Sequence, residues 1–131
     1  MGHGWYILNE DHTFSEASDM YEYSKWDKDY GFAGLRGDRK TVERYESKEF
    51  TVSTVFLGLD HSFEENEPPI LFETLVFNGN LDGEMRRYHT WEEAVKGHNN
   101  MVKLCGGIAK RKKEENIKEE EIQNRFDILD L

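Results

Sequence analysis

The chain has 131 residues and a formal net charge of −10, with 37% hydrophobic and 13% aromatic residues. Its length suits one domain with a single core, and its charge disfavours direct binding to nucleic acids or anionic membranes, so we expect basic partners. The single cysteine, Cys105, excludes an internal disulfide, and no apolar run is long enough to cross a bilayer, so we expect a cytoplasmic protein.

The first thirty residues predict a short strand and an acidic helix. The aromatic and aliphatic run 5–8 is typical of a strand and ends in a polar turn. Ser15 precedes a segment in which Ala17 and Met20 recur at helical spacing, so Ser15 is the expected N-cap of a helix that ends near Asp29. Acidic side chains outnumber basic ones in this segment, which is typical of a solvated helix face.

Glycines at positions 31, 34 and 37 predict a flexible connector. Their spacing differs from that of phosphate-binding loops, and the Lys-Ser/Thr ending of a P-loop does not follow them. The alternation from Thr41 to Ser47 then predicts an edge strand with charge on both faces.

The densest apolar run of the chain lies between Phe50 and Asn78 and predicts two strands around an acidic loop. Residues 50–61 carry β-branched and aromatic side chains on both alternating faces, so we expect an internal strand covered on both sides. Residues 62–69 hold three glutamates and a Pro-Pro pair, which predict a loop. Residues 70–78 resume as a strand, paired antiparallel with the first.

Glu73 is the one charged residue of this second strand, on the same face as Leu71 and Leu75. Burying an unpaired carboxylate among apolar side chains costs several kcal/mol. We therefore expect either a partly exposed face or a cationic partner such as Arg86 or Arg87.

The segment from Glu84 to His89 predicts a third central strand, and Thr90 to Glu93 matches the capping box S/T-x-x-E of a helix start. The helix that follows has an apolar stripe that includes His98 and Cys105, and we expect Gly106-Gly107 to end it. We interpret His98 as a hydrogen-bonded core histidine and Cys105 as a small buried hydrophobic residue.

The composition changes abruptly after Gly107, where a basic block at 110–113 precedes acidic residues that can pair with it at helical spacing. The short apolar stripe of Ile122, Phe126 and Leu129 predicts a surface for self-association, and a frayed tail is the alternative. The predicted architecture is one α+β domain, residues 1–107, and a charged helical tail, residues 108–131. The domain is expected to hold an antiparallel sheet of about four to five strands packed by helices.

Three elements of the sequence resemble a family of small proteins carried by tailed bacteriophages and prophages. They are G-L-D-H at 58–61, F-E-T-x-V-F at 72–77 and R-Y-x-T-x-x-E-A-x-x-G-H at 87–98, within a similar region of roughly 42–102. The resemblance implies a phage origin, hence a host-cell location, and a β-rich core closed by a helix; it implies no particular activity. The matching polar positions are Asp60, His61, Glu73, Tyr88, Thr90, Glu93 and His98.

The charge pattern favours a binding protein. Residues 49–84 contain eight acidic residues and no Lys or Arg, so one end of the central hairpin should be strongly negative and dock on a basic surface. Together with the resemblance, this predicts an anti-CRISPR-like inhibitor that occupies a basic, nucleic-acid-binding surface of a host defence protein or nucleoprotein complex. The residues expected to contact this partner are Asp60, Glu64, Glu65, Glu67, Glu16, Asp19 and Glu22.

The alternative is a small enzyme or ligand-binding domain that uses Asp60, His61, Glu73 and His98. Carboxylates and imidazoles can bind a divalent metal or carry out acid–base chemistry, provided that the four side chains converge in one cleft. Because the sequence has no ligand spacing such as H-E-x-x-H, we assign no catalytic residue, metal ligand or cofactor. A structural role in the phage particle is a third class of function.

Overall fold

The computed structural model describes the backbone of residues 4–129 and the side chains of residues 4–127. The predicted α+β class is confirmed, since a four-stranded antiparallel sheet and a separate two-stranded hairpin pack with two helices. The elements are β1 (Tyr6–Leu8), β2 (Phe14–Glu16), α1 (Met20–Tyr30), β3 (Thr41–Glu46), β4 (Thr51–Phe56), β5 (Phe72–Phe77), β6 (Met85–Tyr88) and α2 (Trp91–Leu129).

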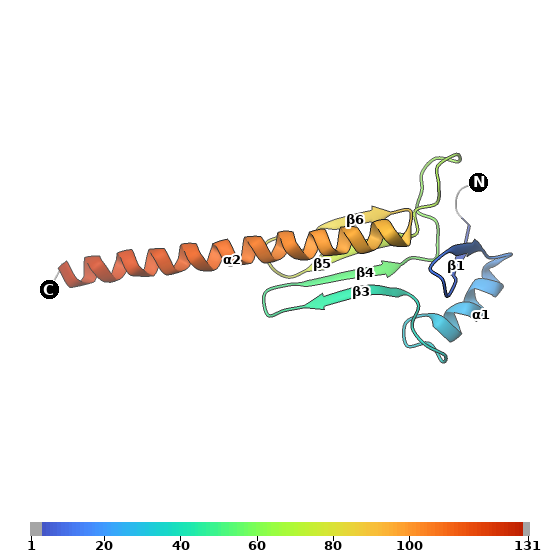
Figure 1. The fold of residues 1–131 in the computed structure, drawn as a ribbon, viewed down its shortest axis with the longest axis horizontal. Helices are drawn as coiled ribbons and strands as arrows, with labels where there is room; N and C mark the ends of the chain where they lie inside the picture. The colour runs from blue at the N-terminus through green and yellow to red at the C-terminus, as the bar shows by residue number, and fades with distance from the viewer. Residues whose placement is uncertain (1–3, 130–131) are drawn as a thin grey trace.

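The molecule is elongated because α2 runs across the sheet and continues far past its end (Figure 1). The sheet has the order β3-β4-β5-β6, and α2 contacts all four of its strands. The β1–β2 hairpin and α1 gather at the opposite end of the sheet (Figure 1). In the described part of the chain, no helix is both long and apolar enough to cross a bilayer.

The central strand β4 is internal, as predicted, and lies between β3 and β5. Val52, Thr54 and Phe56 are buried toward α2, whereas the residues that alternate with them are only half-buried. The expectation of cover on both faces is therefore wrong, since one face of an antiparallel sheet can remain open to solvent. We call this half-buried surface the outer face of the sheet.

Two further strand predictions have different outcomes. The edge strand expected at 41–47 is confirmed as β3, which pairs with β4 alone. The third central strand expected at 84–89 is β6, which is the other edge, because the chain leaves β6 directly into α2 instead of adding another strand.

The first helix begins later than predicted. Ser15 lies in β2 opposite Ile7, and the N-cap is Asp19, whose Oδ1 accepts a hydrogen bond from the backbone N–H of Glu22 at 2.8 Å. Because residues 14–16 pair with β1 as a strand, their backbone cannot form the first turn of a helix. The helix therefore begins about one turn later than predicted.

The buried face of α1 also differs from the predicted one. Met20 and Tyr21 are exposed, whereas Tyr23 and Trp26 are buried. The Trp26 ring packs edge-on against Phe56 of β4, with centroids 5.8 Å apart. Aromatic contacts of this kind join α1 to the end of the sheet and build the larger of two hydrophobic clusters.

The predicted start of α2 is confirmed, because the Thr90 hydroxyl accepts a hydrogen bond from the backbone N–H of Glu93 at 3.1 Å. The predicted stop at Gly106-Gly107 is wrong, since α2 continues to Leu129. Glycine costs about 1 kcal/mol in a helix interior, and the Lys, Arg and Glu residues that follow are good helix formers that offset this cost.

Two glycines of α2, Gly97 and Gly106, lead to opposite predictions. A Cβ at position 97 would lie 2.2 Å from the Tyr88 hydroxyl oxygen, whereas a Cβ at position 106 would meet no atom within 4 Å. We expect Gly97→Ala to lower the free energy of unfolding by about 1–3 kcal/mol through overpacking. Gly106→Ala should raise it, by up to about 1 kcal/mol, through helix propensity. Denaturant unfolding of both variants measures the contrast, and equal stabilities would contradict the close seating of α2 on β6.

Candidate functional site

The acidic loop, residues 62–69, projects from the end of the sheet beside the N-terminal hairpin (Figure 1). The side chains of Glu64, Glu65 and Glu67 are exposed on it. Phe63 lies in the same loop and is 89% exposed. The loop thus presents an aromatic ring among three carboxylates. The sequence had predicted the carboxylates as contact residues but not the aromatic ring.

Asp60 closes the base of this loop. It is 4% exposed, and its carboxylate accepts hydrogen bonds from the backbone N–H of Ser62 at 2.8 Å and of Ile70 at 2.9 Å. The Ser62 hydroxyl donates to the second carboxylate oxygen at 2.9 Å. Asp60, which the sequence assigned to the partner surface, is therefore buried in the stem and holds the two ends of the loop together.

Two histidines add to the same stem. Nδ1 of His61 lies 2.7 Å from the carbonyl oxygen of Leu59, and Nδ1 of His89 lies 3.0 Å from that of Pro69. The backbone N–H of His61 also donates to the carbonyl of Ile70 at 3.0 Å. Both imidazoles are thus hydrogen-bonded to backbone around the acidic loop.

Glu16 extends the negative region at the base of the loop. β1 runs beside residues 58–60, where the backbone N–H of Tyr6 donates to the carbonyl of Gly58 at 2.7 Å. Burial raises the pKa of the Tyr6 hydroxyl, and the nearby carboxylates of Glu16 and Asp60 raise it further. The two acidic groups therefore act on the same small region.

The other two predicted contact residues, Asp19 and Glu22, are exposed but take part in the cap of α1. Glu22 accepts a hydrogen bond from the backbone N–H of Ser18 at 3.0 Å. The hydrogen bonds from Ser18, chiefly that of its hydroxyl, hold the pKa of Glu22 below its usual value. Both carboxylates therefore serve the helix start and remain open to solvent.

Glu73 lies on the outer face of the sheet and is paired. Arg87, its neighbour across the β5–β6 ladder, donates from Nε to Glu73 Oε2 at 3.0 Å. The Glu73 side chain is 14% exposed. The expectation of an arginine partner is confirmed, and it is Arg87 that fills the role.

His98 lies on the opposite face of the sheet, in a buried hydrogen-bond network. Its Nδ1 is 2.8 Å from the Thr54 hydroxyl, which is 2.6 Å from the Thr74 hydroxyl. The Tyr88 hydroxyl donates to Thr74 at 3.1 Å. Burial lowers the pKa of His98, and the carboxylate of Glu43, 3.8 Å from Nε2, opposes that shift. The interpretation of His98 as a core histidine is confirmed.

The four residues of the enzyme hypothesis do not converge. Glu73 points to the outer face, His98 is buried between α2 and the sheet, and Asp60 belongs to the loop stem. Within residues 4–127, no group of three or more His, Cys, Asp or Glu side chains is arranged to hold a metal ion. The shared cleft that this hypothesis requires is not formed.

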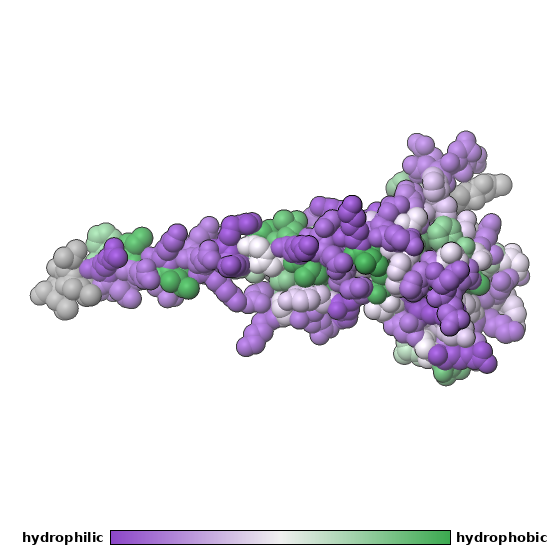
Figure 2. Space-filling view, viewed as in Figure 1, coloured by the Kyte–Doolittle hydropathy of each residue, from purple (hydrophilic) through white to green (hydrophobic). Residues whose placement is uncertain are grey.

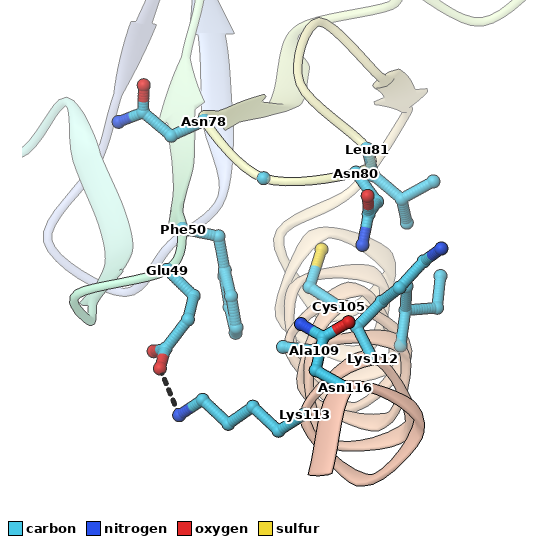
Figure 3. A pocket seen from close by; sticks show the side chains of 12 residues that line it. Glu49, Phe50, Asn78, Asn80, Leu81, Cys105, Ala109, Lys112, Lys113 and Asn116 are labelled. Atoms are coloured by element: carbon cyan, nitrogen blue, oxygen red, sulfur yellow. Dashed lines mark ion pairs between the residues drawn. The ribbon is translucent and has the colours of Figure 1, made fainter. Parts of the chain in front are cut away.

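A hollow of about 290 Å³ lies where α2 leaves the sheet (Figure 3). Its apolar part comes from the β3–β4 and β5–β6 turns and from α2, and an ion pair between Lys113 and Glu49 closes one side (Figure 3). Burial raises the pKa of the Cys105 thiol in its wall. The lining residues are Glu49, Phe50, Asn78, Gly79, Asn80, Leu81, Cys105, Ile108, Ala109, Lys112, Lys113 and Asn116.

Sequence reasoning missed Phe63, the stem role of Asp60 and the hollow. The Asp-x-Ser spacing at 60–62 is a usable signal for the stem, because an aspartate often accepts the backbone N–H two residues on. No local signal marks the hollow, since its walls are more than twenty residues apart in the chain.

Comparison of the chain with protein-family models, with curated proteins and with solved structures found no match. The resemblance to phage proteins therefore stays a prediction from sequence elements.

The buried imidazole leads to a prediction about pH. Because burial lowers the pKa of His98, the unfolded chain takes up a proton near pH 6.5 that the folded chain resists. The free energy of unfolding should therefore fall as the pH drops below about 6.5. His98→Gln should be less stable at pH 7 but should lose less on going from about pH 7 to 5. Urea unfolding across this range measures both, and an equal loss in the wild type and in His98→Gln would contradict this role of His98.

The stem of the acidic loop leads to a second prediction. Asp60→Ala leaves two backbone N–H groups and one hydroxyl without this acceptor, so we expect a loss of about 3 kcal/mol in the free energy of unfolding. Amide hydrogen exchange should speed up at Ser62 and Ile70. Glu65→Ala in the exposed part of the loop should change stability by less than about 0.5 kcal/mol. Similar effects of the two substitutions would contradict the stem role.

Proposed function

We propose that this chain is a binding protein that docks on a basic surface of another protein through its acidic loop. The observation that carries the proposal is the combination on one loop of three exposed glutamates and Phe63, 89% exposed, above a stem held by Asp60. Aromatic side chains are enriched at the centres of interfaces, which suits an exposed ring surrounded by carboxylates.

Charge supports the choice of a basic partner. The segment 49–84 that carries the loop has no Lys or Arg. The nearest arginine across the sheet, Arg87, is already paired with Glu73. The field at the loop is therefore negative, and such a field speeds encounter with a positive surface and orients the docking. The Phe63 ring then has the role of an apolar anchor after encounter.

The stem supports specific docking. A loop whose two ends are joined through one buried carboxylate loses less conformational freedom on binding than a free loop does. The narrower hypothesis, an inhibitor that covers the nucleic-acid-binding surface of a host defence protein, depends on the resemblance to phage proteins and is part of the proposal.

Affinity capture from a bacterial host lysate tests this proposal. The tagged chain should retain a basic protein at about 0.05 M salt and lose it at about 0.5 M, because exposed charges are screened. The triple variant Glu64→Gln, Glu65→Gln, Glu67→Gln should fail to retain that protein even at the lower salt concentration. Phe63→Ser should weaken retention without changing its salt dependence.

The matched control removes the same number of charges elsewhere. Glu46→Gln, Glu84→Gln and Glu114→Gln together keep the loop intact, and this variant should retain the partner as the wild type does. If both triple variants lose the partner equally, net charge rather than the loop drives binding. If neither does, the proposal is wrong.

A further inference from the structure

Within the described residues, the part of α2 beyond the sheet buries no side against another element. Every described side chain from 110 to 127 is exposed, and Figure 2 shows this segment as a thin extension with apolar patches. At 1.5 Å per residue it extends roughly 25–30 Å. An isolated helix of this length is only marginally stable in water, because most helix stability in proteins comes from packing of one face.

The charges of this segment are self-complementary. A basic block, Lys110 to Lys112, lies four to six residues before residue 116. An acidic block, Glu119 to Glu121, lies three to five residues after it. Two parallel copies would place like charges side by side. Two antiparallel copies related by a two-fold axis near residue 116 would place the basic block of each copy beside the acidic block of the other. The symmetry therefore forms this contact at two places.

Ion pairs within the chain leave most of these charges available. Among the described residues, Lys113 pairs with Glu49, and Lys112 lies 4.0 Å from Glu115. The acidic block at 119–121 forms no ion pair in the described part of the chain. The block is thus free to meet a basic partner segment.

The apolar side chains follow the same symmetry. One side of α2 carries four apolar residues, Leu104, Ile108, Ile122 and Phe126. Ile108 and Ile122 are two heptads apart, Leu104 precedes Ile108 by four residues, and Phe126 follows Ile122 by four, so all four share one side of the helix. Leu104, Ile122 and Phe126 are 47%, 52% and 59% exposed. Around an axis near residue 116, Ile122 of one copy comes opposite residues 108–110 of the other, and Phe126 opposite 104–106.

We infer that α2 pairs with α2 of a second copy in an antiparallel arrangement, with the two-fold axis near Asn116. Phe126 of each copy then lies opposite residues 104–106 of the other copy, next to Cys105, which lines the hollow drawn in Figure 3. The apolar stripe described above supplies the contact, and the charge blocks set its direction. The predicted stripe of Ile122, Phe126 and Leu129 is part of this surface, although the side chain of Leu129 lies outside the described residues. The surface is separate from the acidic loop.

Charge reversal tests this pairing by sedimentation of the full chain. Lys110→Glu, Arg111→Glu and Lys112→Glu together give the segment a strongly negative net charge, and Glu119→Lys, Glu120→Lys and Glu121→Lys together give it a strongly positive one. Lys113 stays unchanged because it pairs with Glu49. The wild type should dimerise, each variant alone should dimerise more than about tenfold more weakly, and an equimolar mixture should form a heterodimer.

Cysteine crosslinking tests the direction, in a Cys105→Ala background. Glu115→Cys lies near the axis and on the same side of α2 as the apolar stripe, so it should form an intermolecular disulfide. Ile122→Cys lies on that side too but should not form one, because the two copies of residue 122 would be about 18 Å apart along the helix. A disulfide at 122 would indicate a parallel pair and overturn the proposal.

Two further results would overturn it: a wild type that stays monomeric at its highest soluble concentration, or two charge-reversed variants that remain monomeric when mixed. The loop variant Glu64→Gln, Glu65→Gln, Glu67→Gln should dimerise as the wild type does. This variant separates the pairing of α2 from the proposed binding function, since each can fail without the other.

Discussion

The seating of α2 on the four-stranded sheet is the contact on which the rest of the structure depends. Gly97 lets the helix backbone approach the Tyr88 ring, and Tyr88 in turn donates to Thr74. His98 joins the same network through Thr54, with every member but Tyr88 fully buried. Buried polar groups must be hydrogen-bonded, so this network admits few alternative positions of the helix along the sheet.

Fixing α2 in this way separates two surfaces of different character. At one end of the sheet, the acidic loop lies beside the N-terminal hairpin, and its stem is closed by Asp60. At the other end, the helix leaves the sheet between two turns and carries its charge blocks into solvent. The proposed partner surface and the proposed self-association surface therefore lie at opposite ends of the sheet, so both can be occupied together.

Local patterns predicted much of the fold. The strands β4 and β5, the acidic loop and the Thr90 cap were all found where the residues indicated, since turn and cap chemistry act over a few neighbours. The N-cap of α1 was misplaced because β2 pairs with β1, a contact that short-range periodicity does not show. The Gly106-Gly107 pair did not stop α2, because two unfavourable residues are outweighed by the helix formers around them.

The sequence by itself determined which residues alternate, where the acidic loop lies and that Glu73 needed either access to solvent or a cationic partner. Only the tertiary structure decided that Glu73 meets Arg87 on the outer face while His98 is buried on the other, which separates the residues of the enzyme hypothesis. The physical reason is that period-two alternation assigns residues to two faces without saying which face a helix will cover. That choice depends on where α2 packs, and α2 contacts strands more than forty residues earlier in the chain.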